Sequence, residues 1–207
     1  SMKKNLTELV FILDKSGSMS GLEKDTIGGY NSFLKKQQKS KGECRITTVL
    51  FDNNYELLHD RIDLEAVKPL TEKDYQVGGS TALMDAIGMT INKLVAVEKK
   101  TEKAFQAKNV LFVIITDGLE NSSKEYSIKK VKDLIEQQKK AGWEFIFLGA
   151  NIDAIETAET IGINPDRVQN YQATGKEVKA NYYRMSETVT DFRLKNKISD
   201  DWKKTKK

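Results

Sequence analysis

The stretch VLFVIIT, residues 110–116, is the most apolar part of the chain. A run that stays apolar until Thr116 is typical of a strand that is buried on both faces. Strands of this kind lie in the middle of parallel sheets, where helices cover both sides. Residues 110–116 therefore predict the central strand of an α/β domain.

Five other segments predict strands around this centre, and helical patterns separate most of them. These segments are 6–13, 45–51, 55–62, 143–149 and 167–171. The segment 55–62 follows a polar turn and is expected to pair antiparallel with 45–51. The alternation of strands and helices predicts a doubly wound, mostly parallel sheet of six strands, with helices on both faces.

Three helix starts carry capping residues, and Ser127 is expected to cap the helix that contains Val131 and Ile135. Ser80 is expected to cap a helix whose apolar face spans residues 83–94, and Thr174 with Glu177 forms the pattern of a capping box before the last helix. Apolar residues of the last helix recur at intervals of three and four, as one stripe: Val178, Tyr182, Met185, Val189 and Phe192. We expect the aromatic residues of this helix, including Tyr183, to pack in the core.

The composition is that of an ordinary globular protein. The chain has 207 residues, of which 39% are hydrophobic and 31% charged, and only 2 are Pro. Neither a Pro/Gly/Ser-rich linker nor a repeat of fixed period interrupts it. We therefore expect one domain over residues 5–194, a disordered N-terminus at 1–4 in which Ser1 is a cloning scar, and a basic tail over 195–207.

The charge of the chain is concentrated in this tail. The formal net charge is +4, and residues 195–207 hold six Lys and two Asp, which leaves 28 basic and 28 acidic residues elsewhere. A basic tail could touch nucleic acid, but a solvated, frayed end is the simpler interpretation. No apolar run approaches the roughly 20 residues of a membrane span, no secretory signal stands out, and Cys44 is the single cysteine. These features predict a cytoplasmic protein with no membrane attachment and no intrachain disulfide.

Oxygen-bearing side chains gather at the predicted carboxyl ends of the strands, where open α/β sheets bind ligands. Asp14, Ser16 and Ser18 follow the first strand at intervals of two, Thr81 precedes a helix, and Asp117 follows the central strand. Each residue alone could be a turn former or a cap. Together, with no His or Cys near them, they predict a site for a hard cation, Mg²⁺ or Mn²⁺ rather than zinc.

Three motifs at these positions, DKSGSM at 14–19, GSTAL at 79–83 and ITDG at 115–118, point to one family. They resemble the motifs of a von Willebrand factor type A (vWA) domain with an intact metal-ion-dependent adhesion site (MIDAS). The resemblance covers roughly residues 6–172, and the last helix and tail are also similar to small bacterial single-domain members. It implies a Rossmann-like sheet with one antiparallel edge strand.

The resemblance also implies how the metal is held and used. Ser16, Ser18 and Thr81 would bind through their hydroxyls, and Asp14 and Asp117 directly or through water. These donors leave part of the metal's shell to water, which a Glu or Asp of a partner protein replaces in the family. We therefore expect a non-catalytic, Mg²⁺-dependent protein-binding module. Bacterial relatives often act with chaperone-like ATPases, in stress responses or in phage-related clusters, so the resemblance implies a partner in such an assembly.

Two other functions stay open at this stage. A Mg²⁺-dependent phosphotransferase or phosphatase could use Asp14 as its nucleophile, although such enzymes carry a second carboxylate where Ser16 stands. Nucleic-acid binding would rest on the lysine tail alone. The only histidine, His59, lies on the expected edge strand and predicts a surface or packing role. Cys44 is expected to be a small buried hydrophobic residue.

Overall fold

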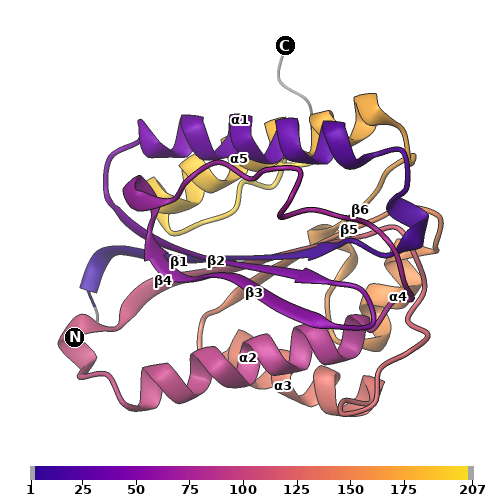
Figure 1. The fold of residues 1–207 in the computed structure, drawn as a ribbon. Helices are drawn as coiled ribbons and strands as arrows, with labels where there is room; N and C mark the ends of the chain where they lie inside the picture. The colour runs from indigo at the N-terminus through magenta and orange to yellow at the C-terminus, as the bar shows by residue number, and fades with distance from the viewer. Residues whose placement is uncertain (1–2, 205–207) are drawn as a thin grey trace.

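A six-stranded sheet forms the middle layer of the computed structural model, which describes residues 3–204 (Figure 1). Its strands are β1 (Lys3–Asp14), β2 (Glu43–Phe51), β3 (Tyr55–Asp63), β4 (Ala107–Thr116), β5 (Glu144–Gly149) and β6 (Val168–Asn170). They lie in the order β3-β2-β1-β4-β5-β6, and within the described residues β3 alone runs antiparallel, against β2. The predicted Rossmann-like fold class is confirmed.

The apolar stretch 110–116 lies within β4, which pairs with β1 on one side and β5 on the other. Its side chains alternate between the two faces of the sheet, as the period of a strand requires. Leu111 and Val113 enter one hydrophobic core, and Phe112 and Ile114 enter the other. All four are fully buried, so the prediction of a central strand buried on both faces is confirmed.

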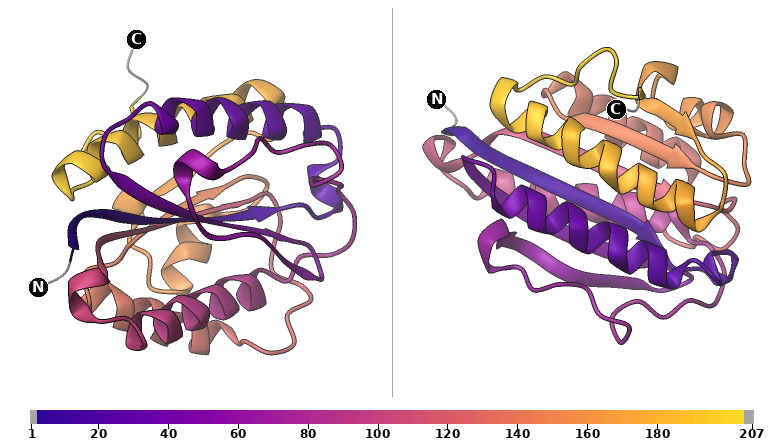
Figure 2. Two further views of the ribbon diagram at one scale, coloured as in Figure 1. Left: turned by 60° about the vertical axis from the view of Figure 1, so that its left-hand side comes forward. Right: turned by 90° about the horizontal axis from the view of Figure 1, so that it is seen from above.

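Helices cover both faces of the sheet (Figures 1 and 2). On one face lie α1 (Glu23–Gln38) and α5 (Gly175–Lys195), and on the other α2 (Leu83–Lys99), α3 (Ile128–Lys140) and α4 (Ala154–Thr160). Short 3₁₀ turns complete the chain: η1 (Gly17–Met19), η2 (Leu64–Ala66), η3 (Lys103–Phe105) and η4 (Pro165–Arg167). The predicted stripe of α5 is buried against the sheet and α1. No helix within residues 3–204 is long and apolar enough to cross a membrane.

At the start of α5, one of the two hydrogen bonds of the predicted capping box is confirmed. The Thr174 hydroxyl accepts a hydrogen bond from the Glu177 N–H at 3.2 Å. Of the aromatic residues in this helix, Tyr182 and Phe192 are buried, whereas Tyr183 is 44% exposed. The prediction that Tyr183 packs in the core was wrong, because adjacent residues of a helix point about 100° apart and the stripe already contains Tyr182.

The segment after α5 packs on the domain. Ile198 and Trp202 are buried, and the Trp202 indole N–H donates to the backbone oxygen of Asp166 at 2.8 Å. The prediction of a loose tail was therefore wrong for residues 196–204, because apolar side chains between the lysines enter the core. The predicted disorder at residues 1–4 was also too long, since β1 begins at Lys3. Residues 1–2 and 205–207 lie outside the described part of the chain.

His59 and Cys44 both have structural roles, as expected. The His59 ring stacks on Tyr30, with centroids 6.4 Å apart, and its Nδ1 lies 2.8 Å from the Thr48 hydroxyl oxygen. Cys44 is 4% exposed. Burial raises the pKa of its thiol to about 12, so the thiol stays protonated at neutral pH.

Candidate metal centre

The order of the strands reverses between β1 and β4, because the chain proceeds from β1 outward to β2 and β3 but from β4 outward to β5 and β6. The two strands are parallel neighbours. Their carboxyl ends therefore open side by side at the switch point, which is where doubly wound sheets bind ligands. Asp14 is the last residue of β1, the loop after it carries Ser16 and Ser18, and the loop after β4 carries Asp117.

The loop that carries Thr81 is tied to the loop after β1 by backbone hydrogen bonds. The Gly17 N–H donates to Gly79 O at 2.9 Å, and the Gly78 N–H donates to Lys15 O at 3.0 Å. Gly79 has a φ of +78°, and a Cβ there would lie 2.2 Å from the Asn53 side-chain oxygen. The positive φ makes any side chain at Gly79 strained, and a Cβ there would also displace the Asn53 side chain.

Asp14 is held on both of its carboxylate oxygens. Its Oδ1 accepts from the Ser16 N–H at 2.7 Å, and its Oδ2 accepts from the Thr116 hydroxyl at 2.8 Å and the Asp117 N–H at 3.3 Å. The Tyr75 hydroxyl donates to the Asp14 backbone oxygen at 2.5 Å. Asp14 therefore has a fixed orientation and joins the ends of β1 and β4.

The three hydroxyls lie around the Asp117–Gly118 turn, and the Ser18 hydroxyl contacts Asp117 itself. The oxygens of Ser16 and Ser18 lie 3.1 Å apart, and the Ser18 hydroxyl donates to Asp117 Oδ1 at 2.5 Å. A Cβ on Gly118 would lie 3.4 Å from both the Ser18 and the Thr81 hydroxyl oxygens, so these two oxygens flank one point. The structure thus brings together the five residues that the sequence singled out.

Asp117 carries an unsatisfied acceptor. The residue is 1% exposed, and its Oδ2 has no hydrogen-bond partner among the described residues. Burial raises the pKa of this carboxyl to about 6; the Ser18 hydrogen bond opposes the rise and the Asp14 carboxylate adds to it. A buried acceptor without a donor costs about 1–3 kcal/mol. A cation beside Oδ2 would remove that cost, so the hard oxygen donors fit Mg²⁺ or Mn²⁺.

A model of the von Willebrand factor type A domain family matches residues 8–180. The chain belongs to this family. The model spans all three motifs and ends within α5.

Solved structures share the fold of this vWA domain at low sequence identity. The vWF domain of the type V pili tip protein Mfa5 from Porphyromonas gingivalis has a TM-score of 0.65 and 11% identity, over 97% of this chain and 99% of that one. The pilus adhesin SpaC from Lactobacillus rhamnosus GG has a TM-score of 0.64 and 11% identity, over 92% of this chain and 30% of that one. No curated protein matches the sequence significantly.

A third similar structure contains a metal. Proximal thread matrix protein 1 from the mussel byssus, described with a zinc-occupied MIDAS motif, has a TM-score of 0.61 and 13% identity, over 91% of this chain. This vWA domain spans just under half of the length of the mussel protein, 46–47%. At these identities the similarity establishes the fold of the present chain.

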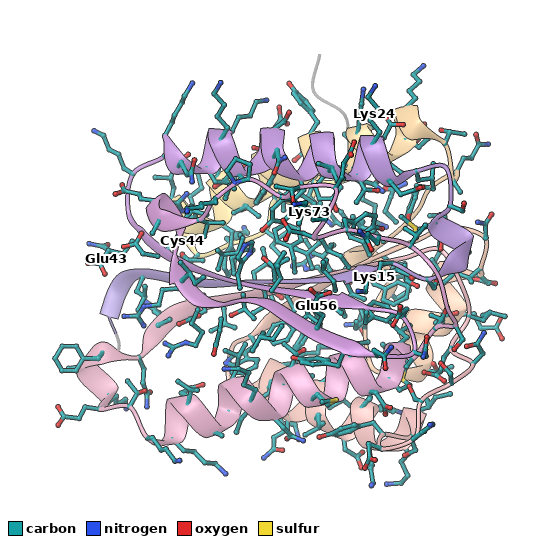
Figure 3. All side chains as sticks on the ribbon, viewed as in Figure 1. Lys15, Lys24, Glu43, Cys44, Glu56 and Lys73 are labelled. Carbon is teal, nitrogen blue, oxygen red and sulfur yellow. The ribbon has the colours of Figure 1, made fainter. Side chains whose placement is uncertain are left out.

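Lys15, inside the first motif of the vWA domain, does not occupy the site. Its Nζ lies 2.8 Å from Glu56 Oε2 on β3, and Figure 3 labels both residues. The Lys15 ammonium is therefore paired with a carboxylate at the sheet edge.

No group of three or more His, Cys, Asp or Glu residues in the described part of the chain is placed to hold a metal. The two carboxylates of the centre thus depend on hydroxyl donors to complete a metal shell.

The start of α2 corrects one prediction. Ser80 does not cap this helix; the N-cap residue is Ala82, whose side chain makes no hydrogen bond. Glu120 Oε1 accepts from the Met84 N–H at 3.0 Å instead. The cap thus comes from the loop after β4, which a search for a local capping residue does not reveal.

Asn121 and Tyr75 are further residues that the sequence did not single out. Asn121 Oδ1 accepts from the Thr81 N–H at 2.8 Å, and its own N–H donates to Thr81 O at 2.9 Å. Asn121 therefore fixes the loop that carries the third hydroxyl. Its place just after Asp117-Gly118 was a usable signal, whereas nothing in the sequence around Tyr75 indicates its contact with Asp14.

We expect Glu120→Ala to lower the free energy of unfolding by about 1 kcal/mol, the typical value of a lost helix cap. This corresponds to a fall in Tm of roughly 2–4 °C for a domain of this size. Thermal unfolding in EDTA measures the change. Glu125→Ala, which removes an exposed side chain of the same loop, serves as the matched control and should leave Tm unchanged. Equal effects of the two substitutions would contradict the capping role of Glu120.

Proposed function

We propose that this vWA domain is a non-catalytic module that holds Mg²⁺ or Mn²⁺ at an intact MIDAS and docks a carboxylate of a partner protein on it. The observation that carries the proposal is the buried, unpartnered Asp117 Oδ2 next to converging hydroxyl oxygens. Ser16, Ser18 and Thr81 would supply hydroxyl ligands, and Asp14 and Asp117 would bind directly or through water. The cation would supply the positive charge that attracts the partner's Glu or Asp.

Two similar proteins support this proposal by their descriptions. The mussel protein holds zinc at a MIDAS motif, which supports a divalent cation at the equivalent loops. SpaC is a pilus adhesin, which supports a binding role. Mg²⁺ remains our choice for this chain because all five donors are oxygens. The bacterial resemblance further suggests a partner in an ATPase-containing, stress-related or phage-related assembly.

The surroundings of Asp14 favour docking over phosphoryl transfer. A nucleophilic carboxylate needs a free oxygen that a substrate can reach. Asp14 is 2% exposed, and each of its oxygens accepts at least one hydrogen bond from Ser16, Thr116 or Asp117. The carboxylate is therefore placed to orient a loop rather than to attack a phosphate.

The C-terminal segment likewise gives little support to nucleic-acid binding. Trp202 anchors it on the domain, and the Lys203 ammonium donates to Pro165 O at 2.9 Å. A basic arm that reaches along a nucleic acid would have to release these contacts. The metal centre is thus the better-supported site of partner binding.

The test is an affinity pull-down from a lysate of the organism that makes the protein. Immobilised wild type, Asp117→Ala and the control Glu125→Ala are each used with Mg²⁺ and again with EDTA. We expect one set of partner proteins that wild type and Glu125→Ala retain in Mg²⁺ and lose in EDTA, and that Asp117→Ala does not retain. Partners retained equally in EDTA, or by Asp117→Ala, would contradict metal-bridged docking.

A further inference from the structure

A groove separates α1 from α5 on the face of the sheet opposite α2 and α3, where the right-hand view of Figure 2 shows the two helices side by side. It has a volume of about 530 Å³. Its lining includes Gly28, Ser32 and Lys36 from α1 and Lys176, Ala180 and Tyr183 from α5. None of the five residues of the metal centre lines it, so it is a separate surface.

The charge of the groove is of one sign. Lys36, Lys176 and Lys179 line it, and no Asp or Glu does. Lys179 pairs with Asp25 at 3.3 Å, at one end of the groove. Among the described residues no carboxylate pairs with Lys36 or Lys176; the Lys36 ammonium lies 4.3 Å from the centroid of the Tyr183 ring. Because the formal charges of residues 1–194 balance overall, a lining that holds lysines and no carboxylate favours an anionic occupant.

The groove also has an apolar part. Tyr183 exposes 44% of its surface there, although a large aromatic side chain gains from burial. Gly28 is exposed beside it, and a Cβ on this residue would meet no atom within 4 Å. Neighbouring Gly29 has a packing reason, since its Cβ would lie 2.6 Å from Tyr182. No packing contact requires a glycine at position 28, although glycine lowers the stability of a helix relative to Ala. Gly28 leaves open space in the lining of the groove.

The two walls of the groove are held at both ends. Asp25 and Lys179 connect the starts of the helices. Near their ends, the Gln37 side chain donates to Ser186 O at 2.8 Å, and Arg193 donates to Gln37 O at 2.8 Å. The shape of the groove is therefore formed before any partner arrives, which lowers the entropic cost of binding.

We propose that this groove binds an acidic peptide segment of a protein partner. Carboxylates of the segment pair with Lys36 and Lys176, and an aromatic or aliphatic side chain lies over Gly28 against the Tyr183 ring. A protein segment fits better than a nucleic acid, because three lysines with Asp25 at one end are few beside the roughly 6–10 phosphate contacts of a strongly salt-dependent DNA-binding protein. The apolar part of the lining, at Gly28 and Tyr183, can also bury an apolar side chain, which a phosphate backbone does not offer.

The test uses the whole chain in EDTA, so that the metal centre cannot capture the probe. The probe is poly(Glu,Tyr), an acidic copolymer with aromatic side chains, and heparin serves as a polyanion without them. Amide resonances in ¹⁵N spectra report where each polymer binds. We expect poly(Glu,Tyr) to shift resonances within residues 28–36 and 176–186, and heparin to bind more weakly.

Two pairs of variants make the test specific. Gly28→Leu fills the groove and should weaken poly(Glu,Tyr) binding by at least about tenfold, whereas Gly28→Ala should raise Tm by about 1–4 °C and retain binding. Lys36→Glu should weaken binding more than Lys35→Glu, which changes the same charge on α1 outside the lining. Undiminished binding by Gly28→Leu, equal losses in the two lysine variants, no binding of the copolymer, or tighter binding of heparin would each overturn the proposal.

Discussion

Asp117→Ala is expected to abolish the rise in Tm that Mg²⁺ or Mn²⁺ gives the wild-type protein. At a metal concentration about 100 times Kd, binding to the folded state adds about 2.7 kcal/mol to the free energy of unfolding. For a domain of this size that is a rise in Tm of roughly 5–10 °C. Thermal unfolding across a metal titration, with EDTA as the reference, measures it.

Comparison with Asp14→Ala separates the two carboxylates. We expect both variants to lose the metal response, but only Asp14→Ala to lose substantial stability in EDTA. Asp14 accepts hydrogen bonds from Ser16 and Thr116, which would be left without their partner, whereas one oxygen of Asp117 has no partner within residues 3–204 to lose. A metal-induced rise in either variant equal to that of wild type would place the metal elsewhere.

Trp202→Ala is expected to lower the free energy of unfolding by about 3–5 kcal/mol, the usual range for truncating a buried Trp. Trp202 is 5% exposed, belongs to the core between the sheet and α5, and hydrogen-bonds the backbone of Asp166. Tm should fall by roughly 10 °C. Chemical and thermal denaturation in EDTA measure the loss.

Lys203→Ala is the matched control for this change. Its side chain is exposed in its contact with Pro165 O, so its removal should shift Tm by no more than about 1–2 °C. If Trp202→Ala were as mild as Lys203→Ala, the segment after α5 would not be part of the core in solution.

The centre of the fold is predictable because its signals are local. An uninterrupted apolar run specifies β4, and the spacing of Val178, Met185 and Val189 specifies the buried face of α5. The misassigned features depend on distant partners. Ser80 stands where a cap is expected, but Glu120, from another loop, supplies the hydrogen bond. Trp202 lies between two acidic residues and two lysines, and only the three-dimensional core decides that it is buried.

The candidate site likewise contains residues that local sequence signals indicate and residues that they do not. Strand ends and hydroxyl spacing indicate Asp14, Ser16 and Ser18, because parallel strands deliver their carboxyl ends to one edge. The residues that hold these side chains in place carry no such pattern. Tyr75 reaches the Asp14 backbone from a loop without periodicity, and the contact of Asn121 with Thr81 spans 40 residues of sequence.

The central claim is that one divalent cation binds at the loops after β1 and β4. The most direct measurement is an anomalous difference map from a crystal of the whole chain soaked in Mn²⁺. We predict one strong peak among the side-chain oxygens of Ser16, Ser18, Thr81 and Asp117, and no such peak in a crystal of Asp117→Ala. A strong Mn²⁺ peak at another site, or none at these oxygens in the wild-type protein, would contradict the claim.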